Sequence, residues 1–269
     1  MRLPARVSAA ALSAATALAL ATACDLLPDD APAAAPYARL TGPEVVDKAL
    51  AATRAAKAVR MTVRTTTPEG PVEAYVATDV GGVCTVTLSM GAAGTLELVR
   101  AGGTVRTRSD AAMLRATSTG RGPRGDAEVE RLTGRWVEPA DGDRQARTAE
   151  RYCDRETFLG LLAPTSGTAR KGRATALSPD EPSDEEPAAG APAPAGPSSA
   201  GPAPGTPALT VTGGADGRKW SVSIATEGRP YLLELRAAPG PDGTGHGAAP
   251  VTVEFSEFGK PFTARQPKP

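Results

Sequence analysis

Residues 61–108 contain five short runs in which apolar and polar side chains alternate, with glycine-rich turns between them. The turns recur about every ten residues, which is typical of an antiparallel meander. Because side chains alternate along a strand, one face of the third run collects Cys84, Val86, Leu88 and Met90. Further runs that alternate or are rich in β-branched residues follow between residues 172 and 258. Antiparallel strands therefore dominate the predicted fold.

Two principal helices are expected beside these strands. Thr41 and Glu44 have the spacing of a capping box, and small apolar residues then recur every three or four positions from Val45 to Val59. A second helix is predicted to begin near Cys153, with apolar residues at Phe158, Leu159, Leu161 and Leu162. Helices and an antiparallel sheet together predict the class α+β, with one sheet face under helices and the other largely in solvent.

The first residues have the features of an export signal. Arg2 and Arg6 form a short basic region, and an apolar run ends in small residues before Cys24. That run is too short for a transmembrane helix, which needs about 20 apolar residues. We therefore predict a signal peptide over residues 1–23. The sequence "ATAC" allows two interpretations, an ordinary signal-peptidase site or a lipobox whose cysteine is acylated, with palmitate as one of the acyl chains.

Three cysteines bear on that choice. Cys84 and Cys153 lie in the exported part, where an oxidising compartment allows a disulfide. Their pairing would close a loop of about 70 residues and would place the helix near Cys153 over the Val86 face of the sheet. Cys24 is then left over, and an unpaired cysteine in an exported protein calls for an explanation. Acylation of Cys24 supplies one, so the lipobox is the preferred interpretation.

The remaining composition divides the chain. Residues 24–40 are rich in proline and alanine without periodicity, which predicts a flexible tether between a lipid anchor and a folded domain over residues 41–269. Within the domain, residues 178–207 lack core-forming side chains and are expected to be a disordered Pro/Ala/Gly-rich insertion. The insertion is interpreted as a tolerated loop, and an interaction arm is the alternative.

Several function classes are disfavoured. Lys plus Arg and Asp plus Glu both number 30 and only 4% of residues are aromatic, so nucleic-acid binding is not expected. The one histidine, His246, lies in a glycine-rich loop without a neighbouring nucleophile, so no enzymatic activity is expected. No cysteines or histidines have metal-ligand spacing, so we expect neither a metal nor another cofactor.

A family resemblance rests on the order of the segments. The exported start, the amphipathic helix, "GGVCTVTLSMGAAGTLELVRAGGTVRT", "SDAAMLRA", "LTGRWVE", "YCDRETFLGLL" and "EGRPYLLEL" together resemble the LolA-like bacterial lipoproteins of the LppX/LprG type. The resemblance implies a single strongly curved antiparallel sheet, a half-barrel with helices packed on its concave face. Some members hold lipid acyl chains in the space between. The chain departs from the pattern at Arg106, Met113 and Leu114, where relatives often carry aromatic residues.

Two hypotheses of function follow. In the first, a lipoprotein on the outer face of the cell membrane binds or transfers lipid acyl chains, with a lipid or lipoglycan as its ligand. The residues expected to line its cavity are Val86, Leu88, Met90, Leu96, Leu98, Leu233 and Leu235. In the second, the same fold has a filled core and serves as an envelope interaction or sensor protein. In both, the partner is the membrane, reached through the N-terminal lipid, and the protein is expected to be a monomer.

Overall fold

The computed structural model describes residues 37–68, 70–118, 122–160, 169–177, 202–215, 218–238 and 249–264. All of them belong to one compact unit, Pro36–Pro269. This unit contains the whole sheet, the main hydrophobic core and a disulfide, so it has what a domain needs to fold on its own. The predicted signal peptide and residues 24–36 of the predicted tether lie outside the described residues.

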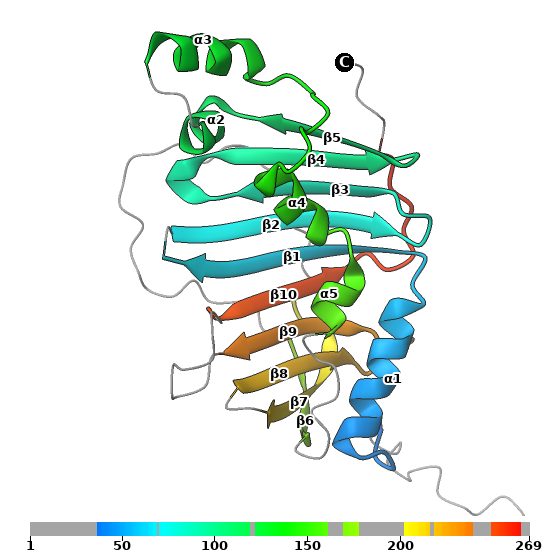
Figure 1. Cartoon of the computed structure of the whole chain (residues 1–269). Coiled ribbons are helices and arrows are strands. Elements are labelled where there is room, and N and C mark those ends of the chain that lie inside the picture. The colour runs from blue at the N-terminus through cyan, green and yellow to red at the C-terminus, as the bar shows by residue number, and fades with distance from the viewer. Residues whose placement is uncertain are drawn as a thin grey trace, which may run out of the picture. The chain divides into compact units, whose positions relative to one another are not determined.

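The described strands form a single ten-stranded sheet in the order β5-β4-β3-β2-β1-β10-β9-β8-β7-β6, with antiparallel neighbours throughout (Figure 1). The strands are β1 (Ala58–Thr67), β2 (Gly70–Asp79), β3 (Cys84–Ser89), β4 (Thr95–Ala101), β5 (Thr104–Ser109), β6 (Arg170–Ala176), β7 (Pro207–Ala215), β8 (Arg218–Ala225), β9 (Leu232–Ala238) and β10 (Val251–Ser256). Two meanders are thus joined by the pairing of β1 with the last strand, β10. The sheet remains open because the edge strands β5 and β6 do not pair with each other.

The helices are α1 (Gly42–Arg54), α2 (Ala111–Thr117), α3 (Pro123–Leu132), α4 (Arg144–Arg151) and α5 (Arg155–Leu159), with a short 3-10 turn η1 (Gly91–Ala93). Figure 1 shows α1, α4 and α5 on one face of the sheet. The capping box at the start of α1 is present, with the Thr41 backbone N–H 2.7 Å from Glu44 Oε2. The prediction that this helix continues to Val59 is wrong, because from Ala58 onward the backbone pairs with β2 instead.

Strand register places the apolar side chains on the helix-covered face. Val63 of β1 has Ala74 and Val253 as its cross-strand partners, and the same row continues on both sides. Its buried members from β4 to β7 are Leu96, Leu88, Ala74, Val63, Val253, Leu235, Val222 and Val211. The two meanders therefore share one hydrophobic core. This arrangement confirms the predicted α+β class and the single antiparallel sheet.

One residue predicted on that face, Leu233, lies elsewhere. The register of β8 and β9 shifts so that Val222 pairs with Leu235 but Ile224 pairs with Leu232. A β-bulge inserts one residue and breaks the alternation of side chains. Leu232 therefore joins Leu235 in the main core, while Leu233 packs in a separate small cluster. The assignment of Leu233 to the same surface as Leu235 is wrong for this reason.

Two predicted boundaries also differ from the structure. Within the last four residues of the predicted tether, 37–40, Tyr37 contacts the sheet: its hydroxyl donates to the Ala225 carbonyl at 2.6 Å, and Lys171 Nζ donates to its carbonyl at 3.0 Å. Of the predicted insertion, residues 178–201 lie outside the described residues. Its end is ordered by hydrogen bonds, since the Leu177 N–H donates to the Thr206 carbonyl at 3.0 Å and β7 begins at Pro207.

Candidate functional site

A disulfide joins the helices to the sheet. Cys84 at the start of β3 and Cys153 just after α4 are bonded, with their Cα atoms 5.7 Å apart and both residues buried. The Thr78 hydroxyl donates to the Cys153 carbonyl at 3.3 Å. The cross-link therefore fastens the end of α4, which lies on β3 and β4. The sequence assigns this position to the helix that begins near Cys153, which is α5, and that assignment is wrong because the preceding helix α4 occupies it.

A second connection comes from Arg155 at the start of α5. Its guanidinium donates to the Ala56 carbonyl at 2.6 Å and to the Thr78 carbonyl at 3.1 Å. Burial lowers the pKa of Arg155, which nonetheless keeps its charge near neutral pH. The side chain thus satisfies one carbonyl group just before β1 and one near the end of β2, and it holds α5 against them.

The predicted lining residues occupy the interior of the main core. Val86, Leu88, Leu96, Leu98 and Leu235 are each at most 3% exposed, and Met90 is half-buried at the edge of the same cluster. Such low exposure means that packed atoms, rather than open volume, surround these five side chains. Met113, one of the departures from the family pattern, is also buried there. A ligand chain would therefore have to displace part of the helix layer.

The helix layer over these residues is thinly packed. Among the α4 residues whose side chains the structure describes, only Ala146 and Ala149 are buried. The strands that α4 contacts, β3 and β4, carry larger buried apolar side chains, among them Val86 and Leu98. Two buried methyl groups contribute only about 1–2 kcal/mol of hydrophobic free energy. Apart from the half-exposed ion pair of Arg100 on β4 with Glu150 on α4, at 3.7 Å, the hold of α4 on the sheet thus depends strongly on the disulfide that follows it.

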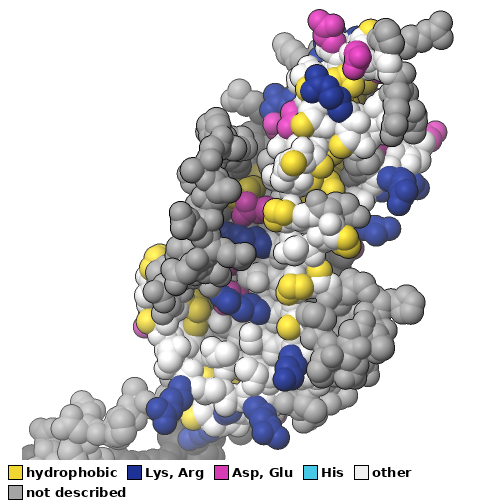
Figure 2. All heavy atoms as spheres, turned by 90° about the vertical axis from the view of Figure 1, so that its left-hand side faces the viewer, with side chains coloured by type: hydrophobic (Ala, Val, Ile, Leu, Met, Phe, Trp, Pro, Cys, Tyr) yellow, Lys and Arg dark blue, Asp and Glu magenta, His cyan; other side chains and the backbone are white. Residues whose placement is uncertain are grey.

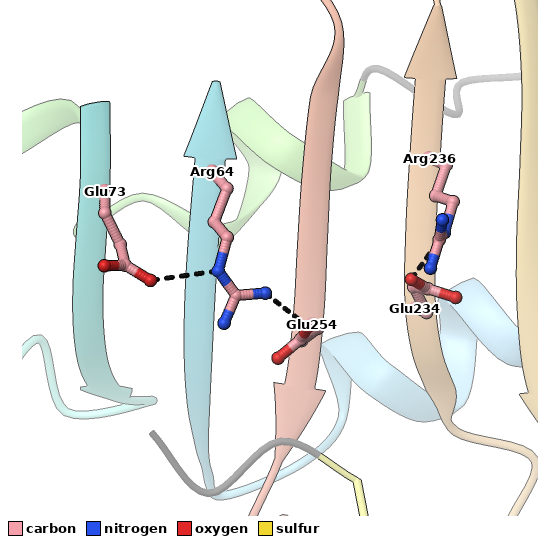
Figure 3. A network of polar contacts seen from close by, with 5 residues as sticks. All are labelled: Arg64, Glu73, Glu234, Arg236 and Glu254. Atoms are coloured by element: carbon pink, nitrogen blue, oxygen red, sulfur yellow. Dashed lines mark hydrogen bonds and ion pairs between the residues drawn. The ribbon is translucent and has the colours of Figure 1, made fainter. Parts of the chain in front are cut away.

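The opposite face of the sheet carries charges. Arg64 bridges two carboxylates from its neighbouring strands, with its Nε 2.9 Å from Glu73 Oε1 and its Nη1 bonded to Glu254 (Figure 3). Glu254 lies directly opposite Glu234, which pairs with Arg236 at 2.6 Å. Like charges opposite each other are unfavourable, so Arg64 and Arg236 offset the repulsion between Glu254 and Glu234. We refer to these five residues as the outer charge network.

Tyr75 borders this network on β2. Burial, together with a hydrogen bond and the charge of Glu73, raises the pKa of Tyr75 to about 12. The phenol is therefore a neutral hydrogen-bond donor at physiological pH, and Tyr75 adds to the polar surface rather than to a reactive centre.

An open groove of about 700 Å³ lies beside the network, across β6 to β10. On the outer face, one row of register partners lines it: Arg170, Thr212, Ser221, Arg236 and Thr252. Lys219, Gly214 and Ala238 form the next row toward the strand ends. The small residues Gly214 and Ala238 leave space in the hollow. Sequence patterns do not predict this groove, because its residues come from five strands whose order in the sheet such patterns do not specify.

Gly213 under the groove is required by packing. Its cross-strand partner is Trp220, and a Cβ added at Gly213 would lie 2.1 Å from the indole ring. The ring therefore lies directly over the glycine on the helix-covered side, where Trp220 is 7% exposed. This contact fixes the strands that support the groove from behind.

The structure adds little to the chemistry expected at other positions. Cys24 and His246 lie outside the described residues, so acylation of Cys24 stays a prediction. Within the described ranges, no group of three or more His, Cys, Asp or Glu side chains is placed to hold a metal ion. No helix in the same part of the chain is both long and apolar enough to cross a membrane.

Comparisons with known proteins concern the fold alone. No protein-family model matches the chain, and no curated protein matches its sequence significantly. Among solved structures, the crystal structure of LprF from Mycobacterium bovis is similar, with 14% sequence identity and a TM-score of 0.44 over 84% of this chain and 96% of that chain. At this identity and TM-score, the likeness supports no conclusion about the architecture or the ligands of this chain.

Proposed function

We propose that the protein is a non-enzymatic, lipid-anchored extracytoplasmic protein that binds lipid acyl chains between its sheet and helices α4 and α5. The observation that carries the proposal is the asymmetry of the α4 contact. Strands β3 and β4 carry the buried Val86 and Leu98, the buried side chains described in α4 are those of two alanines, and the disulfide retains the helix when the contact opens. Local opening of weakly packed elements costs far less than global unfolding.

An acyl chain would replace this weak contact with a stronger one. Each buried methylene contributes about 0.8 kcal/mol, so a chain of a few methylenes against the sheet outweighs the two alanines it displaces. Because Cys153 stays bonded to β3, displaced α4 remains attached and can close again. Binding of this kind suits a carrier that takes up and releases its ligand.

Native mass spectrometry of the gently extracted protein tests this proposal. We expect an added mass that matches one or more acyl lipids and that dissociates on collisional activation. Dansyl-undecanoic acid then serves as a fluorescent probe of the emptied protein, with palmitate as competitor. Absence of both a bound lipid and saturable, palmitate-competed probe binding would refute acyl-chain binding.

Paired tryptophan variants locate the ligand. In Val86→Trp the indole adds bulk on the helix-covered face, and in Thr87→Trp the same bulk lies on the opposite face of the same strand. We expect Val86→Trp to weaken probe binding by about tenfold, equivalent to 1.4 kcal/mol, and Thr87→Trp to leave it unchanged. Far-UV circular dichroism verifies that both variants fold. Equal effects of the two substitutions would contradict the proposed location.

The second hypothesis, a filled core with function on the exposed surface, also has an observation in its favour. The predicted lining residues are nearly inaccessible, as a permanent core would be. Under this hypothesis the protein is isolated without lipid and takes up no probe. The mass-spectrometric experiment therefore separates the two functions.

The anchor requires its own experiment. Support for acylation of Cys24 comes from the Cys84–Cys153 disulfide, which leaves Cys24 as the remaining cysteine of the chain. We expect Cys24→Ala to shift the protein from the membrane fraction to the medium, or to leave it uncleaved. A variant that is processed and membrane-bound as before would show that the lipobox interpretation is wrong. Gel filtration of the released protein tests the expected monomeric state.

A further inference from the structure

The groove across β6 to β10 has an uncompensated positive charge. Arg170 and Lys219 line it from β6 and β8, and neither side chain has a hydrogen bond or an ion pair with another described residue. Arg236 also lines the groove, but its charge is balanced by Glu234. No carboxylate belongs to the groove lining. The hollow therefore presents cations without acidic partners, on a chain whose overall formal charge is zero.

Neutral groups complete the lining, in part apolar ones from Trp220, Ala237, Pro250 and Val251. Thr212, Ser221 and Thr252 provide hydroxyl groups in the same row as Arg170. Strands in a sheet are about 4.8 Å apart, so the three strand spacings from Arg170 to Arg236 amount to roughly 14 Å. Cations with hydroxyl donors between them are suited to a phosphate group, because every phosphate oxygen can accept a hydrogen bond. Figure 2 shows Lys and Arg side chains around the lower part of this side of the molecule, where these strands lie.

The length of the chain limits how far this groove can lie from the proposed anchor. The described chain begins at Tyr37, whose carbonyl accepts from Lys171, the residue next to Arg170 on edge strand β6. Every residue of β6 is exposed. From Cys24 to Tyr37 the chain can extend at most about 45 Å, so an acylated Cys24 would keep β6 within that distance of the bilayer.

We propose, building on the membrane anchoring proposed above, that the groove lined by Arg170 and Lys219 binds the phosphate headgroup of an anionic phospholipid in the anchoring membrane. The headgroup lies among the two cations and the hydroxyls of Thr212 and Ser221. Edge strand β6 then faces the bilayer, and the helix-covered face stands to one side of it. The anchor fixes the protein to the membrane, and the groove fixes its orientation.

Vesicle binding of the unit 36–269, which lacks Cys24, tests the groove independently of the anchor. The probes are vesicles of phosphatidylcholine alone and vesicles that also contain phosphatidylglycerol. We expect cosedimentation with the anionic vesicles only, weakening as salt is raised. Each basic residue near an anionic surface contributes about 1 kcal/mol, so Arg170→Gln/Lys219→Gln should weaken binding about 30-fold.

The matched control is Lys48→Gln/Arg115→Gln, which removes the same charge from exposed positions on α1 and α2. We expect it to reduce binding by less than about threefold, since it changes only the long-range field. Equal losses in the two double variants, or equal binding to neutral vesicles, would overturn the proposal. A third outcome would also overturn the proposal: vesicle binding that is absent in the wild-type unit and appears only when the acidic residues of 180–186 are replaced by amides. The occupant of the groove would then be this acidic segment of the same chain. Failure of Cys24→Ala to release the full chain concerns the anchor alone.

Discussion

Removal of the Cys84–Cys153 cross-link should cost about as much stability as truncation of a large core side chain. The two cysteines are 69 positions apart, and restricting a loop of that length in the unfolded chain is worth about 4 kcal/mol. Cys84→Ala/Cys153→Ala is the suitable variant, because both positions are buried and serine would bury a hydroxyl group. For a domain of this size we expect the midpoint of thermal unfolding to fall by about 10 °C.

Urea unfolding of the unit 36–269, followed by tryptophan fluorescence and far-UV circular dichroism, measures this loss. Dithiothreitol should destabilise the wild type by a similar amount and leave the double variant unchanged, which separates the cross-link from the altered side chains. Hydrogen exchange should show that the amides of α4 lose protection before those of β3. A loss below about 1 kcal/mol, with α4 still protected, would refute the view that the disulfide holds a thinly packed helix layer.

Three further outcomes are expected. Leu98→Ala should lower the free energy of unfolding by about 3–5 kcal/mol in urea if the core is packed without ligand, and a cost near 1 kcal/mol would indicate space beside Leu98. Arg64→Met should destabilise the unit by about 1–3 kcal/mol in the same assay, because Glu254, with a side chain only 15% exposed, loses its partner. Absorbance titration should show a tyrosine ionising near pH 12 that Tyr75→Phe lacks and that Glu73→Gln shifts downward. Since folding raises this pKa, the stability Tyr75 contributes is present below pH 10 and is lost between about pH 10 and 12.

Alternation along single strands was sufficient to predict most of the sheet. It places Val86, Leu88, Leu96 and Leu98 on one face, and the register of β3 with β4 brings them together. The alternation fails at Leu233, because a bulge depends on how β9 pairs with β8 and leaves no mark in the sequence of β9 alone.

Helix periodicity had a similar limit at the end of α1. Val59 continues the spacing of the helix, but the backbone of β1 has strand partners on both sides from residue 60. Tertiary pairing of this kind overrides a local pattern of small apolar residues. The contacts of Tyr37 were likewise invisible, since its partners Ala225 and Lys171 lie more than a hundred residues away.

The two faces of the sheet allow the two proposed sites to be examined separately. Val86 belongs to the core on the helix-covered face of β3, whereas Arg170 lines the groove on the outer face of edge strand β6. Residues that share no partner and lie far apart usually have additive effects, within about 0.5 kcal/mol. Combining Val86→Trp with Arg170→Gln/Lys219→Gln should therefore reduce acyl-probe binding and vesicle binding each as much as the separate changes do. If the combined variant loses more binding free energy in either assay than the separate variants lose together, headgroup and acyl chain belong to one bound lipid that spans the sheet edge.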